Sequence, residues 1–402
     1  MTREFKAWMV GLAYLPFGLF NGFVAAALPL LLTQRGMALD RVAGITFVVL
    51  LPSFTSFLLT PLVDCGLPRR VWAWVLACAA AVCLVSAVLG LDAAVTSSRG
   101  RTLLTVALTL GYLSAQMYGS TIGGMVPNLV DETQLAAAGM WLNIAYLGGM
   151  AGGTLMVVAV TRLPRVGAAG VGVLEMLLPP CILLLARVEE RQPRRVVEAM
   201  HTVLSDLWAV IRQPRYALGF LVFLAPAATF AATNYFGGMG ADFGAPSART
   251  AWITGVGVAI LSSVGAVLGG WLSSRYDRRW LFVGAGVLSS IATFSMAFGP
   301  RLWWVFFAGV SLYALLGGVN YVAASALAFQ LIGRDNPLSA TLYSMLMAAC
   351  NVAIETMVLS DGHAYRVDGA HGLLLTEGTV SICVGVCVLA LVSFVDRTAK
   401  AC

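Results

Sequence analysis

Residues 270–279 (GWLSSRYDRR) and residues 60–64 (TPLVD), the latter followed by Arg69 and Arg70, are two related stretches that decide how this chain is organised. Each stretch ends a long apolar run and brings together an acidic residue and a pair of arginines. The two stretches lie about 210 residues apart in a chain of 402 residues. A repeat at half the chain length indicates two homologous halves, each carrying one copy.

Long apolar runs surround both copies. Hydrophobic residues make up 59% of the chain and charged residues only 11%, whereas soluble proteins carry roughly 25% charged residues. Twelve runs contain at most one acidic residue and no basic one, and each exceeds the roughly 18–20 residues that cross a bilayer as α-helix. In chain order, these spans are residues 7–32, 42–63, 71–91, 102–130, 133–161, 166–186, 216–241, 250–274, 280–300, 302–333, 338–359 and 373–395. The sequence therefore predicts an all-α membrane protein with twelve transmembrane helices.

The longest hydrophilic interruption divides these spans into six and six. It covers residues 187–215, so we predict an N-terminal six-helix bundle over residues 1–186 and a C-terminal bundle over residues 216–402. Apolar residues recur at helical spacing inside the linker, which predicts an amphipathic helix on the cytoplasmic membrane surface. The first span is too long for the apolar core of a signal peptide, so we expect it to be retained.

Basic residues indicate the orientation. When the chain is threaded through twelve spans from a cytoplasmic N-terminus, sixteen of the 25 Lys and Arg residues fall on the inside and nine on the outside. This imbalance predicts that both termini are cytoplasmic. It also accounts for the net charge of +6, so we expect no nucleic-acid partner.

The repeated loop resembles the loop signature of the major facilitator superfamily, of form G-x-L-a-D-r-x-G-r-r. The first copy has Thr60 in place of the leading glycine, and the second has Ser274 where the acid is expected but retains Asp277. This resemblance implies two pseudo-symmetric six-helix bundles, with spans 1, 4, 7 and 10 lining a central cavity, and transport by alternating access.

We interpret the loop residues as contacts that hold cytoplasmic helix ends together and break when the carrier rocks. The alternative is that the arginines only mark the inside face of the membrane. The residues concerned are Asp64, Arg69, Arg70, Arg275, Asp277, Arg278 and Arg279.

A narrower resemblance lies in the second half. Residues 316–324 (LGGVNYVAA), residues 336–346 (NPLSATLYSML) and Asp361-Gly362 resemble the AmpG-type permeases, a branch with peptide and acetyl-coenzyme A transporters and related siderophore importers. This resemblance implies a muropeptide, siderophore or peptide-like substrate and proton symport through acidic residues on span 4. Span 4 of this chain has no acidic residue, which departs from that pattern.

Ionisable side chains inside the spans are candidate functional residues, because placing one in hydrocarbon costs about 2.5–3.5 kcal/mol. We predict proton coupling or gating by Glu355, Glu175 and Glu377. For Glu355 the alternative is an interface carboxylate paired with a nearby arginine. Uncharged polar residues on the cavity spans are candidates for substrate binding, the alternative being hydrogen bonds to neighbouring helices. They are Asn21, Gln116, Tyr118, Asn234, Tyr235, Asn320 and Tyr321.

Other chemistry has little support in the sequence. No phosphate-binding GxxxxGK[ST] motif is present, and the spans hold no cluster of His, Asp and Glu that an enzyme would need. We interpret Asp361, His363, Asp368 and His371 as a solvated outer loop rather than a metal site. We therefore expect no enzyme activity, no metal and no cofactor.

The sequence favours a secondary transporter of a small-to-medium organic solute in a bacterial inner membrane, coupled to protons. We expect a monomer whose partners are the solute and the lipid bilayer. Two alternatives stay open: a lipid or glycolipid flippase on the same fold, and a non-transporting membrane sensor.

Overall fold

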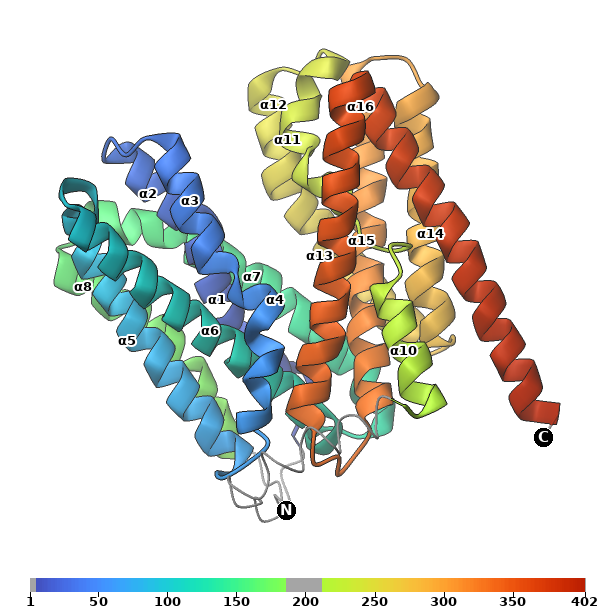
Figure 1. The fold of residues 1–402 in the computed structure, drawn as a ribbon, viewed down its shortest axis with the longest axis horizontal. Helices are drawn as coiled ribbons and strands as arrows, with labels where there is room; N and C mark the ends of the chain where they lie inside the picture. The colour runs from blue at the N-terminus through green and yellow to red at the C-terminus, as the bar shows by residue number, and fades with distance from the viewer. Residues whose placement is uncertain (1–4, 186–211, 402) are drawn as a thin grey trace. The chain divides into compact units, whose positions relative to one another are not determined.

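The computed structural model describes residues 5–185 and 212–401, and within these ranges the chain forms helices and turns with no β-strand (Figure 1). The amphipathic helix predicted for the linker lies almost entirely outside the described residues. Contacts divide the chain into two compact units, Met1–Trp208 with Ile332–Ala348, and Ala209–Leu331 with Ala349–Cys402. The first unit thus includes a short segment from the second half of the sequence.

The first unit is built from long apolar helices. Helix α1, a π-helical turn (Phe23–Ala27) and α2 follow one another without a break, and α8 continues as a 3-10 helix (Pro179–Leu185). Pro52 lacks a backbone N–H, which explains why α3 ends just before it and a new short helix, α4, begins. The helices are α1 (Ala7–Gly22), α2 (Leu28–Gln34), α3 (Leu39–Leu50), α4 (Pro52–Thr55), α5 (Arg69–Thr96), α6 (Ser98–Leu129), α7 (Leu135–Arg162) and α8 (Arg165–Leu177).

Glycines bring α1 and α7 into close backbone contact. A Cβ on Gly11 would lie 2.6 Å from the carbonyl oxygen of Trp141, and one on Gly149 would lie 2.7 Å from that of Leu15. Side chains larger than hydrogen would push the two helices apart, so small residues set this packing, as is usual between membrane helices.

The second unit contains the remaining helices, with α16 from Ala349 onward, and a core of aromatic side chains that includes Phe230, Phe236, Phe306 and Tyr313. Its last helix, α16, has non-helical backbone angles at Asp368 and Gly369, where the chain turns back so that the helix forms two antiparallel arms (Figure 1). The helices are α10 (Pro214–Leu224), α11 (Phe236–Met239), α12 (Ser247–Trp252), α13 (Val258–Ser273), α14 (Arg278–Phe298), α15 (Trp303–Ile332) and α16 (Ser339–Ala401).

The seventh predicted span, residues 216–241, is broken rather than continuous. Helix α10 ends at Leu224, and helical structure returns only as a 3-10 turn, Ala231–Asn234. Pro226 explains the break, because proline lacks an N–H and disfavours helical backbone at the residue before it. Phe230 takes a left-handed conformation (φ 53°) that is strained for a residue with a side chain.

Eight helical stretches of the described residues are long and apolar enough to cross a membrane. They are Ala7–Gln34, Arg69–Thr96, Glu132–Arg162, Arg165–Leu185, Ser247–Ser273, Arg278–Phe298, Trp303–Ile332 and Ser339–Val395. The last covers two predicted spans, and the second predicted span contains only a shorter apolar helix, Gly44–Leu58. The all-helical membrane class is thus supported, whereas the count of twelve and the side of the termini stay predictions.

Candidate functional site

The Asp64 carboxylate is the centre of a polar network in the first unit. Its side chain is fully buried. It accepts hydrogen bonds from the backbone N–H groups of Ala340 (3.3 Å) and Thr341 (2.9 Å) and from the Thr341 hydroxyl (2.6 Å). These amides belong to the first turn of α16, whose N–H groups have no partner inside the helix. Asp64 therefore caps a helix that begins more than 270 residues further along the chain.

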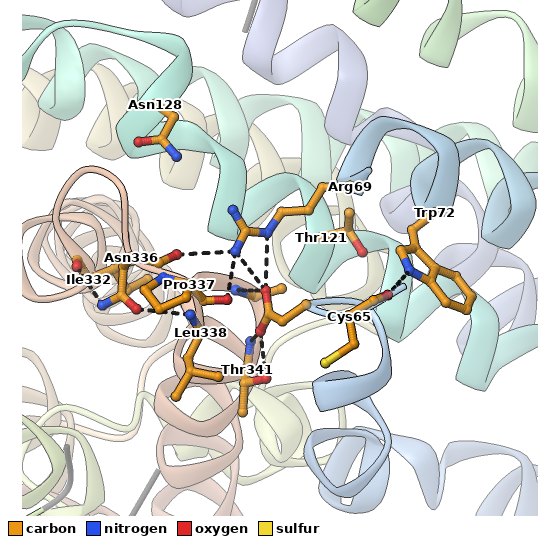
Figure 2. A network of polar contacts seen from close by, with 12 residues as sticks. Cys65, Arg69, Trp72, Thr121, Asn128, Ile332, Asn336, Pro337, Leu338 and Thr341 are labelled. Carbon is orange, nitrogen blue, oxygen red and sulfur yellow. Dashed lines mark hydrogen bonds and ion pairs between the residues drawn. The ribbon is translucent and has the colours of Figure 1, made fainter. Parts of the chain in front are cut away.

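Arg69 binds both the Asp64 carboxylate and the segment that precedes α16. Its Nε and Nη2 atoms lie 3.0 and 2.9 Å from Asp64 Oδ1, and Nη2 also donates to the carbonyl oxygens of Asn336 (3.1 Å) and Pro337 (2.9 Å) (Figure 2). The guanidinium thus neutralises the buried carboxylate and binds the segment that leads into α16. Arg70, the next residue, is half-buried on the first turn of α5.

The same segment is attached to the end of α6. Arg334 Nη2 donates to the carbonyl oxygen of Val130 (3.1 Å) and forms an ion pair with Asp131 (2.8 Å), and the Asp335 amide donates to Asn128 Oδ1 (2.9 Å). Two separate groups of contacts therefore hold Ile332–Ala348 in the first unit.

Close packing accompanies these polar bonds. A Cβ on Gly124 of α6 would lie 2.5 Å from the Ala340 amide nitrogen, so this position accepts only glycine while α16 is attached. Thr60 also donates a hydrogen bond to the Ser344 hydroxyl (3.1 Å).

The second copy of the repeat makes local contacts instead. Asp277 caps its own helix, α14, by accepting from the Arg279 amide (2.8 Å), and it pairs with the Arg279 guanidinium (2.8 Å). Partial burial raises the pKa of Asp277, but the hydrogen bonds and charge of Arg279 outweigh this effect and leave the pKa below its ordinary value. Arg275 lies over the Trp271 ring, and Arg278 donates to Gln330 of α15 (3.2 Å). Asp277 and Arg279 thus cap α14, and Arg278 joins α14 to α15.

The substrate candidates of the first unit hydrogen-bond within it. Asn21 donates to the Tyr146 hydroxyl (2.9 Å), and the buried Tyr118 donates to the carbonyl oxygen of Ala13. Gln116 donates to Ser53 (3.4 Å), whose hydroxyl also contacts that of Tyr112 (3.1 Å). Their predicted role in binding a solute stays a prediction.

The substrate-binding candidates of the second unit differ in how exposed their side chains are. Asn320 is buried and donates to the carbonyl oxygen of Phe282 (2.9 Å), so it joins α15 to α14. Tyr235 donates to the carbonyl oxygen of Val358 on α16 (2.7 Å). Asn234 is exposed and bonds to Ala231, three residues earlier, and Tyr321 is also exposed, at 42%. Of these residues, Asn234 and Tyr321 keep the most accessible side chains.

The three acidic candidates lie in different surroundings. Glu355 is exposed, and in the part of the chain that the structure describes it forms no ion pair, so the predicted arginine partner is not seen. Glu175 is half-buried on α8. Glu377 is fully buried and accepts a hydrogen bond from the hydroxyl of Tyr313.

Asp361 is a buried acid that the sequence reasoning missed. We predicted a solvated loop at residues 361–371, which is wrong, because α16 continues through these residues apart from the kink at Asp368 and Gly369. Asp361 is 0% exposed and neighbours the Glu377 carboxyl group. Gly362, the next residue, packs closely on the second unit's Tyr235, because a Cβ would meet the Tyr235 hydroxyl at 2.6 Å.

Solved structures that are similar to this chain include several membrane transporters. A bacterial homologue of the iron transporter ferroportin, solved outward-facing with soaked iron, has a TM-score of 0.72 at 15% identity and covers 96% of this chain and 98% of its own. The human organic anion transporter MFSD10 has a TM-score of 0.71 at 17% identity, covering 95% and 98%. The transporter FucP, described as a member of the major facilitator superfamily, has a TM-score of 0.69 at 13% identity, covering 95% and 99%. This chain has the major facilitator fold.

Comparison with sequence families covers a smaller part of the chain than the comparison with solved structures. The Sugar (and other) transporter family matches residues 213–329, which lie in the second half of the chain. No curated protein sequence matches the chain. The solved structures show the fold of multi-pass membrane transporters, and neither they nor the partial family match reach the AmpG-type branch or a substrate.

Within the facilitator fold, two features stand out in the described residues. One is the Asp64 network, which joins the first unit to a segment from the second half of the sequence. The other is the buried pair of acidic residues on the two arms of α16, inside the second unit.

Proposed function

We propose that this protein is a secondary transporter that moves a small-to-medium organic solute across a bacterial inner membrane by alternating access. It has twelve spans and cytoplasmic termini, and it is driven by a proton gradient. The observation that carries the proposal is the Asp64 network, in which the N-terminal half holds the segment that opens α16. This contact is polar and discrete, as expected of an attachment that forms and breaks.

The network has the properties of a reversible attachment. Only two side chains, Asp64 and Arg69, supply most of its bonds, and their partners on the other side are mainly backbone groups. Backbone groups at a helix end and in a turn are satisfied equally well by water once the contact opens. The bonds of the Asp64 network can therefore be replaced by water when it opens, which suits a carrier that cycles between two conformations.

We propose a substrate that is muropeptide-like, siderophore-like or peptide-like. The accessible candidates, Asn234 and Tyr321, combine an amide with an aromatic face, a pairing that suits ring-bearing or amphipathic solutes. Related folds transport varied cargo, since the similar structures include an organic anion transporter and an iron transporter homologue. The substrate class is therefore best tested by a panel.

Uptake into vesicles that contain the purified protein tests this function. We expect muropeptides, ferric siderophores or short peptides to accumulate when a pH gradient is imposed, and accumulation to stop when the gradient is dissipated. If lipid probes cross the membrane but no solute in the panel accumulates, a flippase replaces this proposal. No movement of either class favours a sensor.

Glu355 provides a mutational test of coupling. Because it is exposed and unpaired among the described residues, Glu355→Gln should leave folding intact. We expect this variant to exchange solute downhill but to concentrate it at least tenfold less than the wild type. Asp242→Asn, which changes an exposed acid of the same unit, is the matched control. Unchanged accumulation in Glu355→Gln would remove Glu355 from the mechanism.

A further inference from the structure

Asp361 and Glu377 lie on opposite arms of α16 at similar distances from its kink. Asp361 precedes Asp368 by seven residues, and Glu377 follows Gly369 by eight. At 1.5 Å per residue both side chains therefore lie roughly 10–12 Å along the arms, inside the second unit. Both are 0% exposed, and their carboxyl groups are close enough to interact.

The two carboxyl groups have unequal surroundings. Glu377 accepts a hydrogen bond from the Tyr313 hydroxyl through Oε1. Neither oxygen of Asp361 has a donor, and Oε2 of Glu377 also lacks one. In the part of the chain that the structure describes, no lysine or arginine forms an ion pair with either group.

Two adjacent carboxylates without a cation cannot both stay ionised in a buried site, because each raises the cost of the other's charge. One proton between them removes this repulsion and supplies the missing donor. Glu377 already has a donor, the Tyr313 hydroxyl, that stabilises its negative charge, so the proton belongs on Asp361, which has none. Protonated Asp361 can then donate to the free Oε2 of Glu377.

We propose that Asp361 and Glu377 form a proton-binding site, in which Asp361 carries the proton that the transporter takes up and releases. This proposal rests on the transport function proposed above and identifies its coupling site. Release transfers the proton from Asp361 to water and leaves two carboxylates, so it requires water to reach the pair. Uptake reverses this step.

The described side chains around Asp361 and Glu377 offer no cation that could neutralise the two carboxylates in place of a proton. Tyr313 approaches from α15, and Tyr235, which donates to Val358, approaches from the turn before α11. Helix α14 contributes the Ser290 hydroxyl, which donates to the carbonyl oxygen of Gly378 (2.9 Å), and it carries no acidic residue. Among the described residues of these elements, no lysine, arginine or histidine side chain forms an ion pair with Asp361 or Glu377.

The strained turn before Ala231 offers a link between proton binding and movement. Phe230 adopts its left-handed conformation with its ring 4.9 Å from that of Tyr313, the donor to Glu377. Movement of residues 225–230 would therefore change the packing around this donor. The charge balance of the pair then changes with the conformation of the broken seventh span.

Infrared spectroscopy of the purified protein in vesicles tests this site without any substrate. We expect the wild type to show the C=O band of a buried protonated carboxylic acid at neutral pH, shifted in D2O. Asp361→Asn keeps a donor toward Glu377 but cannot titrate, so the band should disappear. Asp242→Asn changes an exposed acid of the same unit and should keep the band.

Tyr313→Phe is a second variant in case Asp361→Asn does not fold. Losing the Tyr313 hydroxyl makes Glu377 a stronger acceptor for the Asp361 proton, so the band should move without disappearing. The absence of a protonated-acid band in the wild type, its survival in Asp361→Asn, or its removal by added sodium or divalent cations would overturn the proposal.

Transport is the second, separate readout. If solute uptake exists, Asp361→Asn should exchange solute as the wild type does and lose at least tenfold in accumulation driven by the pH gradient. Full accumulation by Asp361→Asn would refute coupling through this pair. If the band behaves as expected but no solute moves, the proton site stands and the proposed transport function fails.

Discussion

Replacement of Asp64 with Asn perturbs the network that holds the start of α16 within the first unit. The wild-type carboxylate is fully buried and accepts two hydrogen bonds from Arg69 and three from Ala340 and Thr341. Asn preserves the size of the side chain but removes its charge, and its amide nitrogen donates where the carboxylate accepted. At least one donor at the start of α16 then has no acceptor.

The expected magnitude follows from the bonds that are lost. Removing one partner of a buried ion pair costs about 3–5 kcal/mol. Asp64 divides its bonds between Arg69 and α16, so we assign the attachment of α16 about half of this loss, roughly 2 kcal/mol. Since about 1.4 kcal/mol is a factor of ten, opening of the contact should become roughly 30-fold more frequent.

Hydrogen exchange at the Ala340 and Thr341 amides measures this opening, because both amides are bonded to Asp64 only while α16 is attached. We expect exchange at these amides to accelerate roughly 30-fold in Asp64→Asn. The matched control is Asp277→Asn, which removes the acid of the second copy, where the carboxylate caps its own helix. Unchanged exchange in Asp64→Asn, or equal acceleration in both variants, would refute the reasoning.

Two further predictions concern packing and pH. Gly124→Ala should lower the free energy of unfolding by about 1–3 kcal/mol through overpacking and should accelerate hydrogen exchange at the Ala340 amide. Gly170→Ala is the control, because nothing lies within 4 Å of a Cβ at that position. Equal behaviour of the two variants would contradict the close packing at Gly124. Because the pKa of Asp277 is lowered in the folded protein, its stabilising effect is present above the ordinary value of 3.8 and is lost as the pH falls through the lowered pKa. Thermal unfolding of Asp277→Asn should therefore depend less on pH below 3.8 than that of the wild type, by less than about 1 kcal/mol because Asp277 is 42% exposed.

Much of the fold could be predicted from local sequence. Apolar runs without charges predict helices because the backbone must satisfy its own hydrogen bonds in lipid. The break in the seventh span also had a local signal, since Pro226 lies in the middle of the run, but hydropathy alone does not register a residue that lacks an N–H. The position of Pro226 therefore predicts the break in this span.

The sites were harder to predict because their geometry is not local. The sequence marked Asp64 and Arg69 as functional but could not reveal that their partners are backbone groups of residues 336–341. It treated Asp277 as equivalent to Asp64, although the second copy caps its own helix. Asp361 was missed because its pairing with Glu377 depends on the kink that folds α16 onto itself.

The distance along the chain between Asp64 and its partners has a consequence for biosynthesis. Thr341 is 277 residues further on, so at about 5–20 residues per second the ribosome needs roughly 14–55 seconds to supply it. During that time Asp64 has none of its donors from α16, but Arg69, only five residues away, is already present. Arg69 can therefore neutralise the Asp64 carboxylate during synthesis, until residues 332–348 of the first unit have been made.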